Sequence, residues 1–145
     1  MIDWGADLDG YCSDCTRTLA AGEAGARASE IYALVLEAQL AGLGAVRAGA
    51  EARQVDAAAR AVIDAAGQAE HFGHGLGHGV GLEIHERPRL SQRTEDTLEA
   101  GNVITIEPGV YLPGQFGVRI EDLVVVTAEG REVLTQSPKE LTVTD

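Results

Sequence analysis

The spacing of apolar residues changes along the chain, and the change separates predicted strands from predicted helices. Apolar and β-branched residues mark extended segments from Ile2 to Ala6 and from Tyr11 to Leu19. From about Ala26 to Arg47, and again from about Ala52 to Ala66, apolar residues recur every three or four positions, as in an amphipathic helix. Both helical segments are rich in alanine, so we expect them to pack on a sheet rather than to form a binding site.

The part of the chain after Gly67 has the pattern of extended structure. Glycine occupies every odd position from Gly73 to Gly81, which leaves one face of an extended backbone bare and open to close approach. Four later segments are apolar or β-branched, namely Val103 to Glu107, Val110 to Leu112, Gly117 to Thr127 and Glu132 to Thr135. The order of hairpin, two helices and meander predicts an α+β fold, in which helices cover one face of an antiparallel sheet.

Four acidic residues form two pairs across predicted turns, Asp3 with Asp14 and Glu107 with Glu121. A first turn at residues 7–10 and a second at residues 113–115 would place the members of each pair directly opposite one another. Opposed like charges destabilise a sheet, unless the carboxyl pKa values rise or divalent ions bind between them. Two ions about 3.5–4 Å apart, bridged by carboxylates, would satisfy all four acids.

Composition limits the other possibilities. The 145 residues, 45% of them hydrophobic, suffice for one domain with a modest core. A formal charge of −12, from 23 acidic and 11 basic residues, argues against nucleic-acid binding and against an anionic membrane surface. No apolar run has the length of a transmembrane helix and no secretory signal is recognisable, so the sequence predicts a cytoplasmic protein.

Several short motifs do not fit their usual chemistry. The glycine run lacks the last glycine of the dinucleotide-binding pattern G-x-G-x-x-G, and Arg89 stands where the zinc pattern H-E-x-x-H requires a second histidine. Cys12 and Cys15 have no second cysteine pair to complete a zinc site, and on a strand they would point to opposite faces. We expect these cysteines to be structural.

Six motifs in order resemble those of the pita-bread metallopeptidases, most closely the Xaa-Pro aminopeptidase and Xaa-Pro dipeptidase (prolidase) branch. They are Asp3-Trp4-Gly5, Tyr11-Cys12-Ser13-Asp14-Cys15-Thr16-Arg17-Thr18, Gly77-His78-Gly79-Val80-Gly81, His85-Glu86-Arg87-Pro88, Ile106-Glu107-Pro108-Gly109 and Val118-Arg119-Ile120-Glu121-Asp122. The resemblance extends to about Leu141. It implies the C-terminal part of a pita-bread catalytic domain.

The resemblance also implies a ligand set for two divalent metal ions. The implied ligands are Asp3, Asp14, His78, Glu107 and Glu121, with Asp14 and Glu121 bridging the ions. Four carboxylates and one imidazole suit manganese best, and cobalt or zinc would also be accepted. A water between the ions is the implied nucleophile.

Catalytic roles follow from the same resemblance. Glu107 would transfer a proton as well as bind metal, His85 would stabilise the tetrahedral intermediate or bind substrate, and His74 would line the pocket. Arg119 would hold the acidic cluster together from outside the ligand set. Blander structural roles for His74 and Arg119 stay open.

The resemblance is incomplete at the N-terminus, because the family builds its catalytic domain from two halves and this chain begins almost at the first ligand. Residues 1–145 are therefore expected to be a single, incomplete catalytic domain, associated with the missing part of the enzyme or with further copies of itself.

The sequence leaves two functions open. The first is an enzyme that hydrolyses the Xaa-Pro bond at peptide N-termini or in dipeptides, with proline second in its substrate. The second is a non-catalytic remnant that binds metal or peptide. A methionine aminopeptidase is a weaker alternative, and the sequence does not decide between dipeptidase and aminopeptidase.

Overall fold

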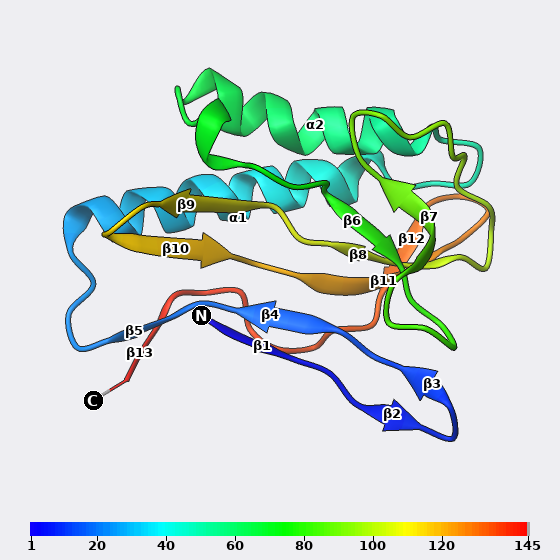
Figure 1. The fold of residues 1–145 in the computed structure, drawn as a ribbon, viewed down its shortest axis with the longest axis horizontal. Coiled ribbons are helices and arrows are strands. Elements are labelled where there is room, and N and C mark those ends of the chain that lie inside the picture. The colour runs from blue at the N-terminus through cyan, green and yellow to red at the C-terminus, as the bar shows by residue number, and fades with distance from the viewer. Residues whose placement is uncertain (145) are drawn as a thin grey trace.

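Two helices lie together over one face of the sheets in the computed structural model, which describes residues 1–144 (Figure 1). Helix α1 spans Ala26–Ala45 and helix α2 spans Ala52–Ala65, so both predicted helices are confirmed to within two residues at either end. A single 3₁₀ turn, η1 (Ala69–His71), follows α2. Within residues 1–144, neither helix is long and apolar enough to cross a membrane.

Thirteen short strands are found in residues 1–144, joined by turns and loops. The strands are β1 (Ile2–Trp4), β2 (Asp7–Leu8), β3 (Tyr11–Cys12), β4 (Cys15–Arg17), β5 (Leu19–Ala21), β6 (Gly77–Gly79), β7 (Glu86–Leu90), β8 (Val103–Ile106), β9 (Gly109–Leu112), β10 (Phe116–Arg119), β11 (Asp122–Val126), β12 (Arg131–Val133) and β13 (Thr142–Thr144).

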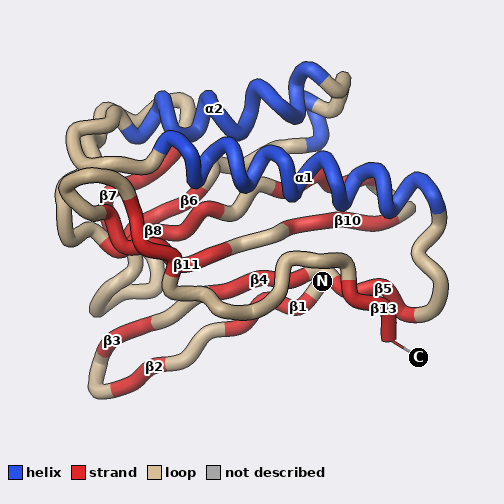
Figure 2. Tube along the Cα trace, turned by 180° about the vertical axis from the view of Figure 1, so that it is seen from behind, coloured by secondary structure: helices blue, strands red, loops and turns tan. Residues whose placement is uncertain are grey.

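The main sheet has the order β12-β11-β8-β6-β7, and all its pairs are antiparallel, as predicted. The first hairpin forms a separate layer on the side away from the helices (Figure 2). Strands β7 and β13 were not predicted. The sequence of β7 is rich in charged residues and contains Pro88, so it lacks the apolar pattern of a strand. Strand β13 has only three residues, and it pairs in parallel with β5.

The glycine run allows close backbone contact, as the sequence predicted, although only Gly77–Gly79 is a regular strand. A Cβ atom added to Gly75 would lie 2.7 Å from the carbonyl oxygen of Leu90. One added to Gly77 would collide with the carbonyl oxygen of Thr105. These glycines therefore let the segment fit between β7 and β8.

A long hairpin carries the second acidic pair. Its turn lies at residues 113–115, where Gly114 has a φ of +73°. Strand β9 pairs with β10, and β8 pairs with β11, in one continuous register in which Phe116 faces Leu112 and Asp122 faces Ile106. This is the predicted register, and it places Glu107 and Glu121 opposite each other in the break between the two ladders.

The register predicted for the first hairpin is wrong. Strands β2 and β3 are joined by a two-residue turn at Asp9-Gly10, whose φ angles of +54° and +85° are both positive. Consequently Asp3 pairs with Thr16 rather than with Asp14. An Asp-Gly pair with two positive φ angles favours a type I′ turn, and the prediction failed because it placed Leu8 inside the turn.

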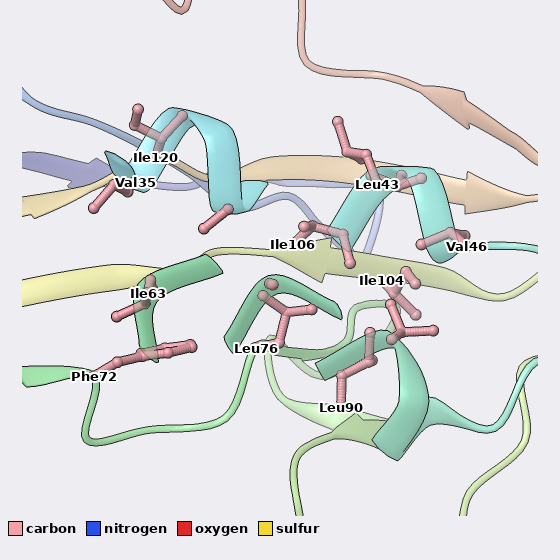
Figure 3. Packing of buried hydrophobic residues seen from close by; sticks show 14 of the residues in the cluster. Val35, Leu43, Val46, Ile63, Phe72, Leu76, Leu90, Ile104, Ile106 and Ile120 are labelled. Atoms are coloured by element: carbon pink, nitrogen blue, oxygen red, sulfur yellow. The ribbon is translucent and has the colours of Figure 1, made fainter. Parts of the chain in front are cut away.

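The core lies between the helices and the main sheet (Figure 3). Val35 and Ile63 from the helices are fully buried, as are Leu76, Ile104 and Ile106 from the sheet side. Each such side chain contributes about 1.5–3 kcal/mol by leaving water, so this layer holds the sheet in place beneath the helices. The apolar positions predicted for the two helices form much of this core.

Candidate metal centre

The five predicted metal ligands come from five separate segments and meet at one place. Asp3 lies on β1, Asp14 precedes β4, His78 lies on β6, Glu107 follows β8 and Glu121 precedes β11. Three groups of possible ligand atoms each fit within 4.8 Å, namely His78 with Glu107 and Glu121, Asp3 with Asp14 and Glu121, and Asp14 with His78 and His85. Asp14, His78 and Glu121 each belong to two of these groups, so the three groups overlap in one cluster.

The break in the long hairpin explains how two glutamates reach the same point. Glu107 and Glu121 lie outside the regular ladders, while their strands continue on both sides. Glu107 keeps a hydrogen bond from its N–H to the Leu76 carbonyl, and the N–H of Glu121 donates to Thr16. Because these N–H groups bond to other segments, the break joins the long hairpin to β4 and to the glycine run.

The first hairpin supplies its acids from one face despite the shifted register. Thr16 faces Asp3, and Asp14 is two residues from Thr16, so all three side chains lie on the same side of the hairpin. Asp3 and Asp14 are therefore diagonal rather than direct neighbours. The side chain of Asp3 is 54% exposed, against 12% for Asp14.

The imidazole of His78 is oriented for ligation through Nε2. Its Nδ1 lies 3.0 Å from the carbonyl oxygen of Gly79, and because a carbonyl only accepts, Nδ1 carries the proton. Nε2 then points at the acids, 3.2 Å from Oε1 of Glu107 and 3.7 Å from Oδ2 of Asp14. A backbone carbonyl on the far nitrogen is a common way of fixing a metal-binding histidine.

The two opposed glutamates have contrasting pKa shifts. Burial raises the pKa of Glu121 to about 8, and the charge of Glu107 adds to the effect, against a hydrogen bond from the Thr16 hydroxyl. Burial also acts on Glu107, but hydrogen bonds with His78 and Thr105 outweigh it and hold the Glu107 pKa below its usual value. The pair thus contains one ionised acid and one that resists ionisation.

The pKa values of Asp14 and His78 are also raised, as expected beside an acidic cluster whose negative charge is not compensated. Burial and the charge of Asp3 raise the pKa of Asp14. Burial lowers the pKa of His78, but hydrogen bonds with Glu107 and the Gly79 carbonyl raise it above its usual value overall. The protein's own cations therefore do not neutralise the cluster.

The donor set fits divalent metal ions. Four carboxylates supply hard oxygen ligands, and the single imidazole suits ions such as manganese, cobalt and zinc. The three groups of possible ligands found in residues 1–144 contain buried side chains and the exposed Asp3 and His85. The centre is therefore open to solvent on the side of the exposed residues. Bound cations would remove the opposition between the carboxylates that raises the pKa of Glu121.

Arg119 contacts acids of both hairpins. Its Nη2 forms a short ion pair with Asp3, its Nε donates to the Thr16 hydroxyl at 3.0 Å, and Nε lies 4.0 Å from Oε2 of Glu107. The guanidinium therefore lies at the edge of the cluster, between its exposed and buried members.

The two remaining predicted histidines have different positions. His85 is exposed, and its ring lies 4.3 Å from the ring of His78, close enough to contact a molecule bound at the centre. His74 belongs to none of the three possible ligand groups found in residues 1–144. Its Nδ1 lies 2.7 Å from the Gly75 carbonyl oxygen, and its Nε2 lies 2.9 Å from the hydroxyl of Tyr111.

Three residues of the centre were missed from the sequence. Thr16 donates to Glu121 at 2.5 Å, Thr105 donates to Glu107 at 2.9 Å, and Tyr111 binds His74. Thr105 could have been found, because it precedes Glu107 by two positions and so shares its face of the strand. Thr16 was hidden by the wrong register, and the contact of Tyr111 with His74 depends on tertiary packing alone.

Solved structures of known enzymes share this arrangement of the chain. The Xaa-Pro dipeptidase from Bacillus anthracis is 54% identical with a TM-score of 0.96, over 98% of this chain and 40% of that one. An X-Pro aminopeptidase from Thermotoga maritima is 44% identical with a TM-score of 0.95, again over 98% and 40%. These similarities confirm the predicted pita-bread fold.

Sequence relatives agree with the structures. The Xaa-Pro dipeptidase of Pyrococcus furiosus is 49% identical over 141 residues, which are 97% of this chain and 40% of that protein. The chain thus spans about 40% of the length of such relatives. The profile of metallopeptidase family M24 matches residues 1–128. With that match and the relatives just described, the chain belongs to metallopeptidase family M24.

Proposed function

We propose that this chain is the metal-bearing part of a dinuclear metallopeptidase that hydrolyses the Xaa-Pro bond at peptide N-termini or in dipeptides. The convergence of four carboxylates and one imidazole from five segments carries the proposal. The Xaa-Pro specificity rests on the names of the relatives, which include both dipeptidases and an aminopeptidase. Because those relatives are longer, the activity is proposed for the assembly to which this chain contributes.

The proposed metal assignment follows the ligand groups. His78 and Glu107 would hold one ion, Asp3 would hold the other, and Asp14 and Glu121 would bridge them. Manganese is the proposed metal, and cobalt and zinc are alternatives. When bound, the ions polarise the scissile carbonyl and lower the pKa of water.

The side chains around the ions would supply binding and proton transfer. The pKa of Glu107 lies below its usual value, so its carboxylate is ionised at neutral pH, the form that a proton acceptor requires. His85 is exposed beside His78 and would contact the substrate. His74 would line the pocket through its Nε2, next to Tyr111, and Arg119 would orient Asp3.

A second candidate function is a non-catalytic module that binds metal or peptide. The exposure of Asp3 favours it, because a half-exposed ligand paired with Arg119 holds an ion less firmly than the buried ligands do. The methionine aminopeptidase alternative receives no support from the names of the relatives described above.

Activity measurements separate the candidates. The chain, with manganese added, is assayed with an Xaa-Pro dipeptide and an Xaa-Pro-Yaa tripeptide. The assay is run with the chain alone and with the chain mixed with the part of a longer relative that it does not cover. Glu107→Gln should abolish hydrolysis, whereas Glu132→Gln, an exposed change on β12, should not alter it. Full activity of Glu107→Gln would refute the catalytic assignment, and manganese binding without hydrolysis in either preparation would favour the second candidate.

Association and location are proposed with the function. The side chains of Met1, Ile2, Trp4, Leu8 and Tyr11 are exposed along the first hairpin, which agrees with a chain that contacts the rest of a larger enzyme or another copy. Size-exclusion chromatography that gives a stable monomer of this 15.2 kDa chain would count against such association. The cytoplasmic location stays a prediction.

A further inference from the structure

An ion pair on α2 lies behind the glycine run and takes no part in the metal centre. Asp56 and Arg60 are one helical turn apart, and Nε and Nη2 of Arg60 donate to the two carboxylate oxygens of Asp56 at 2.9 Å each. The Asp56 side chain is fully buried, and that of Arg60 is 13% exposed. Ionised groups are seldom buried so completely without a specific set of partners.

The partners of this pair are backbone groups of the segment that carries His74. Arg60 donates from Nη1 to the Phe72 carbonyl at 3.0 Å and from Nη2 to the His74 carbonyl at 2.8 Å. The N–H of Leu76 donates to Oδ1 of Asp56 at 3.0 Å. The guanidinium also lies over the ring of Phe72, 4.1 Å from its centroid.

Residues 72–76 have no regular secondary structure, and other backbone hydrogen bonds hold the two ends of the segment, from the Phe72 N–H to the Ala69 carbonyl and from the Glu107 N–H to the Leu76 carbonyl. Gly73 and Gly75 give the segment more conformational freedom than other residues would. Three of its five residues are nevertheless tied to α2 by hydrogen bonds with charged groups. The tied residues alternate with the two glycines, so α2 holds the middle of the segment, at His74, as well as its ends.

The hydrogen bonds between α2 and residues 72–76 also affect the imidazole of His74, through the backbone. The Gly75 carbonyl accepts a hydrogen bond from Nδ1 of His74, so the ring keeps its proton on Nδ1 and presents Nε2 to Tyr111. The peptide group that supplies this carbonyl lies between two residues held by α2, His74 and Leu76. A displaced segment would release both the position and the tautomer of the ring.

We infer that Asp56 and Arg60 form a clamp, a pair of positioning residues that fix His74 in the pocket, a role that rests on the proposed function. His78 does not depend on them in the same way. It lies on β6, where its N–H donates to Thr105 and its partner in the ladder is Arg89. Loss of the clamp should therefore affect His74 and spare the metal ligand four residues further on.

The first test is spectroscopic and independent of activity. Long-range ¹H–¹⁵N spectra of the zinc-loaded chain report the tautomer of each histidine ring. In Arg60→Lys, the lysine keeps a charge beside Asp56 but lacks the planar fork that reaches two carbonyls. The His74 signals should move toward the tautomer mixture of a free histidine, while those of His78 stay in place. Arg53→Lys, on the exposed face of the same helix, is the control.

Binding and kinetics complete the test. Zinc affinity measured by calorimetry should stay within about threefold of wild type in Arg60→Lys. In an active assembly kcat/KM should fall about 10- to 100-fold, the usual range when a reacting group is displaced by about 1 Å. If wild type is inactive, the proposed function fails, while the spectra still decide the role of the clamp.

Unchanged His74 signals in a folded Arg60→Lys chain would overturn the inference, as would equal shifts of His74 and His78, which would indicate general loosening. If Arg60→Lys does not fold, Asp56→Asn is measured in its place. That variant keeps an oxygen for the Leu76 N–H but weakens the hold on the guanidinium. The same two outcomes then support or overturn the role of the clamp.

Discussion

The pKa of Glu121 predicts how the stability of the metal-free chain depends on pH. Glu121 is 1% exposed, and its pKa is raised from 4.5 to about 8, so the folded chain binds its proton more tightly than the unfolded chain does. The stability that this proton gives is complete below about pH 4.5 and is lost as the pH rises through about 8. Between pH 5 and 8, the metal-free chain should therefore become less stable.

The size of the effect is considerable for one side chain. A rise from 4.5 to about 8 corresponds to about 5 kcal/mol of unfolding free energy, because one pKa unit is worth about 1.4 kcal/mol. The raised pKa values of Asp14 and His78 act in the same direction. Glu107 acts in the opposite direction, but its lowered pKa removes stability only as the pH falls below about 4.5, outside this range.

Urea unfolding followed by circular dichroism at pH 5, 6, 7 and 8, with chelator, measures the prediction. The free energy of unfolding should fall by several kcal/mol across the series in wild type. It should fall much less in Glu121→Gln, whose side chain does not titrate, with the remaining fall due to Asp14 and His78. Added manganese should abolish the fall, since bound cations favour the ionised carboxylates.

An exposed control, Glu132→Gln, should behave like wild type. Stability that rises or stays level from pH 5 to 8 in the metal-free wild type would refute the reasoning. So would an identical slope in wild type and Glu121→Gln, because the loss would then come from other groups.

Three further predictions concern packing and the metal sites. Gly77→Ala should lower the free energy of unfolding in urea by about 2–3 kcal/mol, because the added Cβ would collide with a backbone carbonyl of β8. Gly44→Ala, where the Cβ would lie in open space on α1, should raise the free energy of unfolding by about 0.5–1 kcal/mol. Arg17→Met should cost about 3 kcal/mol by removing a 2.8 Å ion pair from buried Asp122; no change would contradict it. Calorimetric titration with manganese should show one tight and one weaker site, and Asp3→Asn should remove the weaker one alone.

The helices and most strands of the main sheet could be predicted because their apolar residues follow a regular period, whereas β7 lacks such a pattern. Val55 and Ile63 recur at helical spacing on the side of α2 that faces away from solvent, and both are buried. Buried polar groups on the same helices could not be predicted from period. Gln39 and Asp56 are buried because their partners are Asp122 and the Leu76 backbone, which lie far away in the sequence or on another element.

The residues predicted as metal ligands lie together even though one of the two predicted registers was wrong. A strand places successive side chains on opposite faces, so an error of one residue in the position of a strand would have moved Asp3 to the other face of the hairpin. The actual turn at Asp9-Gly10 moves the partner of Asp3 by two positions, from Asp14 to Thr16. An even shift preserves the face, and all three side chains still point at Glu121.

The shifted register also changes what the first hairpin can do. With Thr16 opposite Asp3, its hydroxyl donates to Glu121 and accepts from Arg119, so one residue connects the buried Glu121 with the arginine that pairs with Asp3. Direct opposition of Asp3 and Asp14 would have left no position for this hydroxyl. The two hairpins therefore contribute differently: the second opposes two carboxylates in a break of its ladder, and the first inserts a hydrogen-bonding residue between two acids on one face.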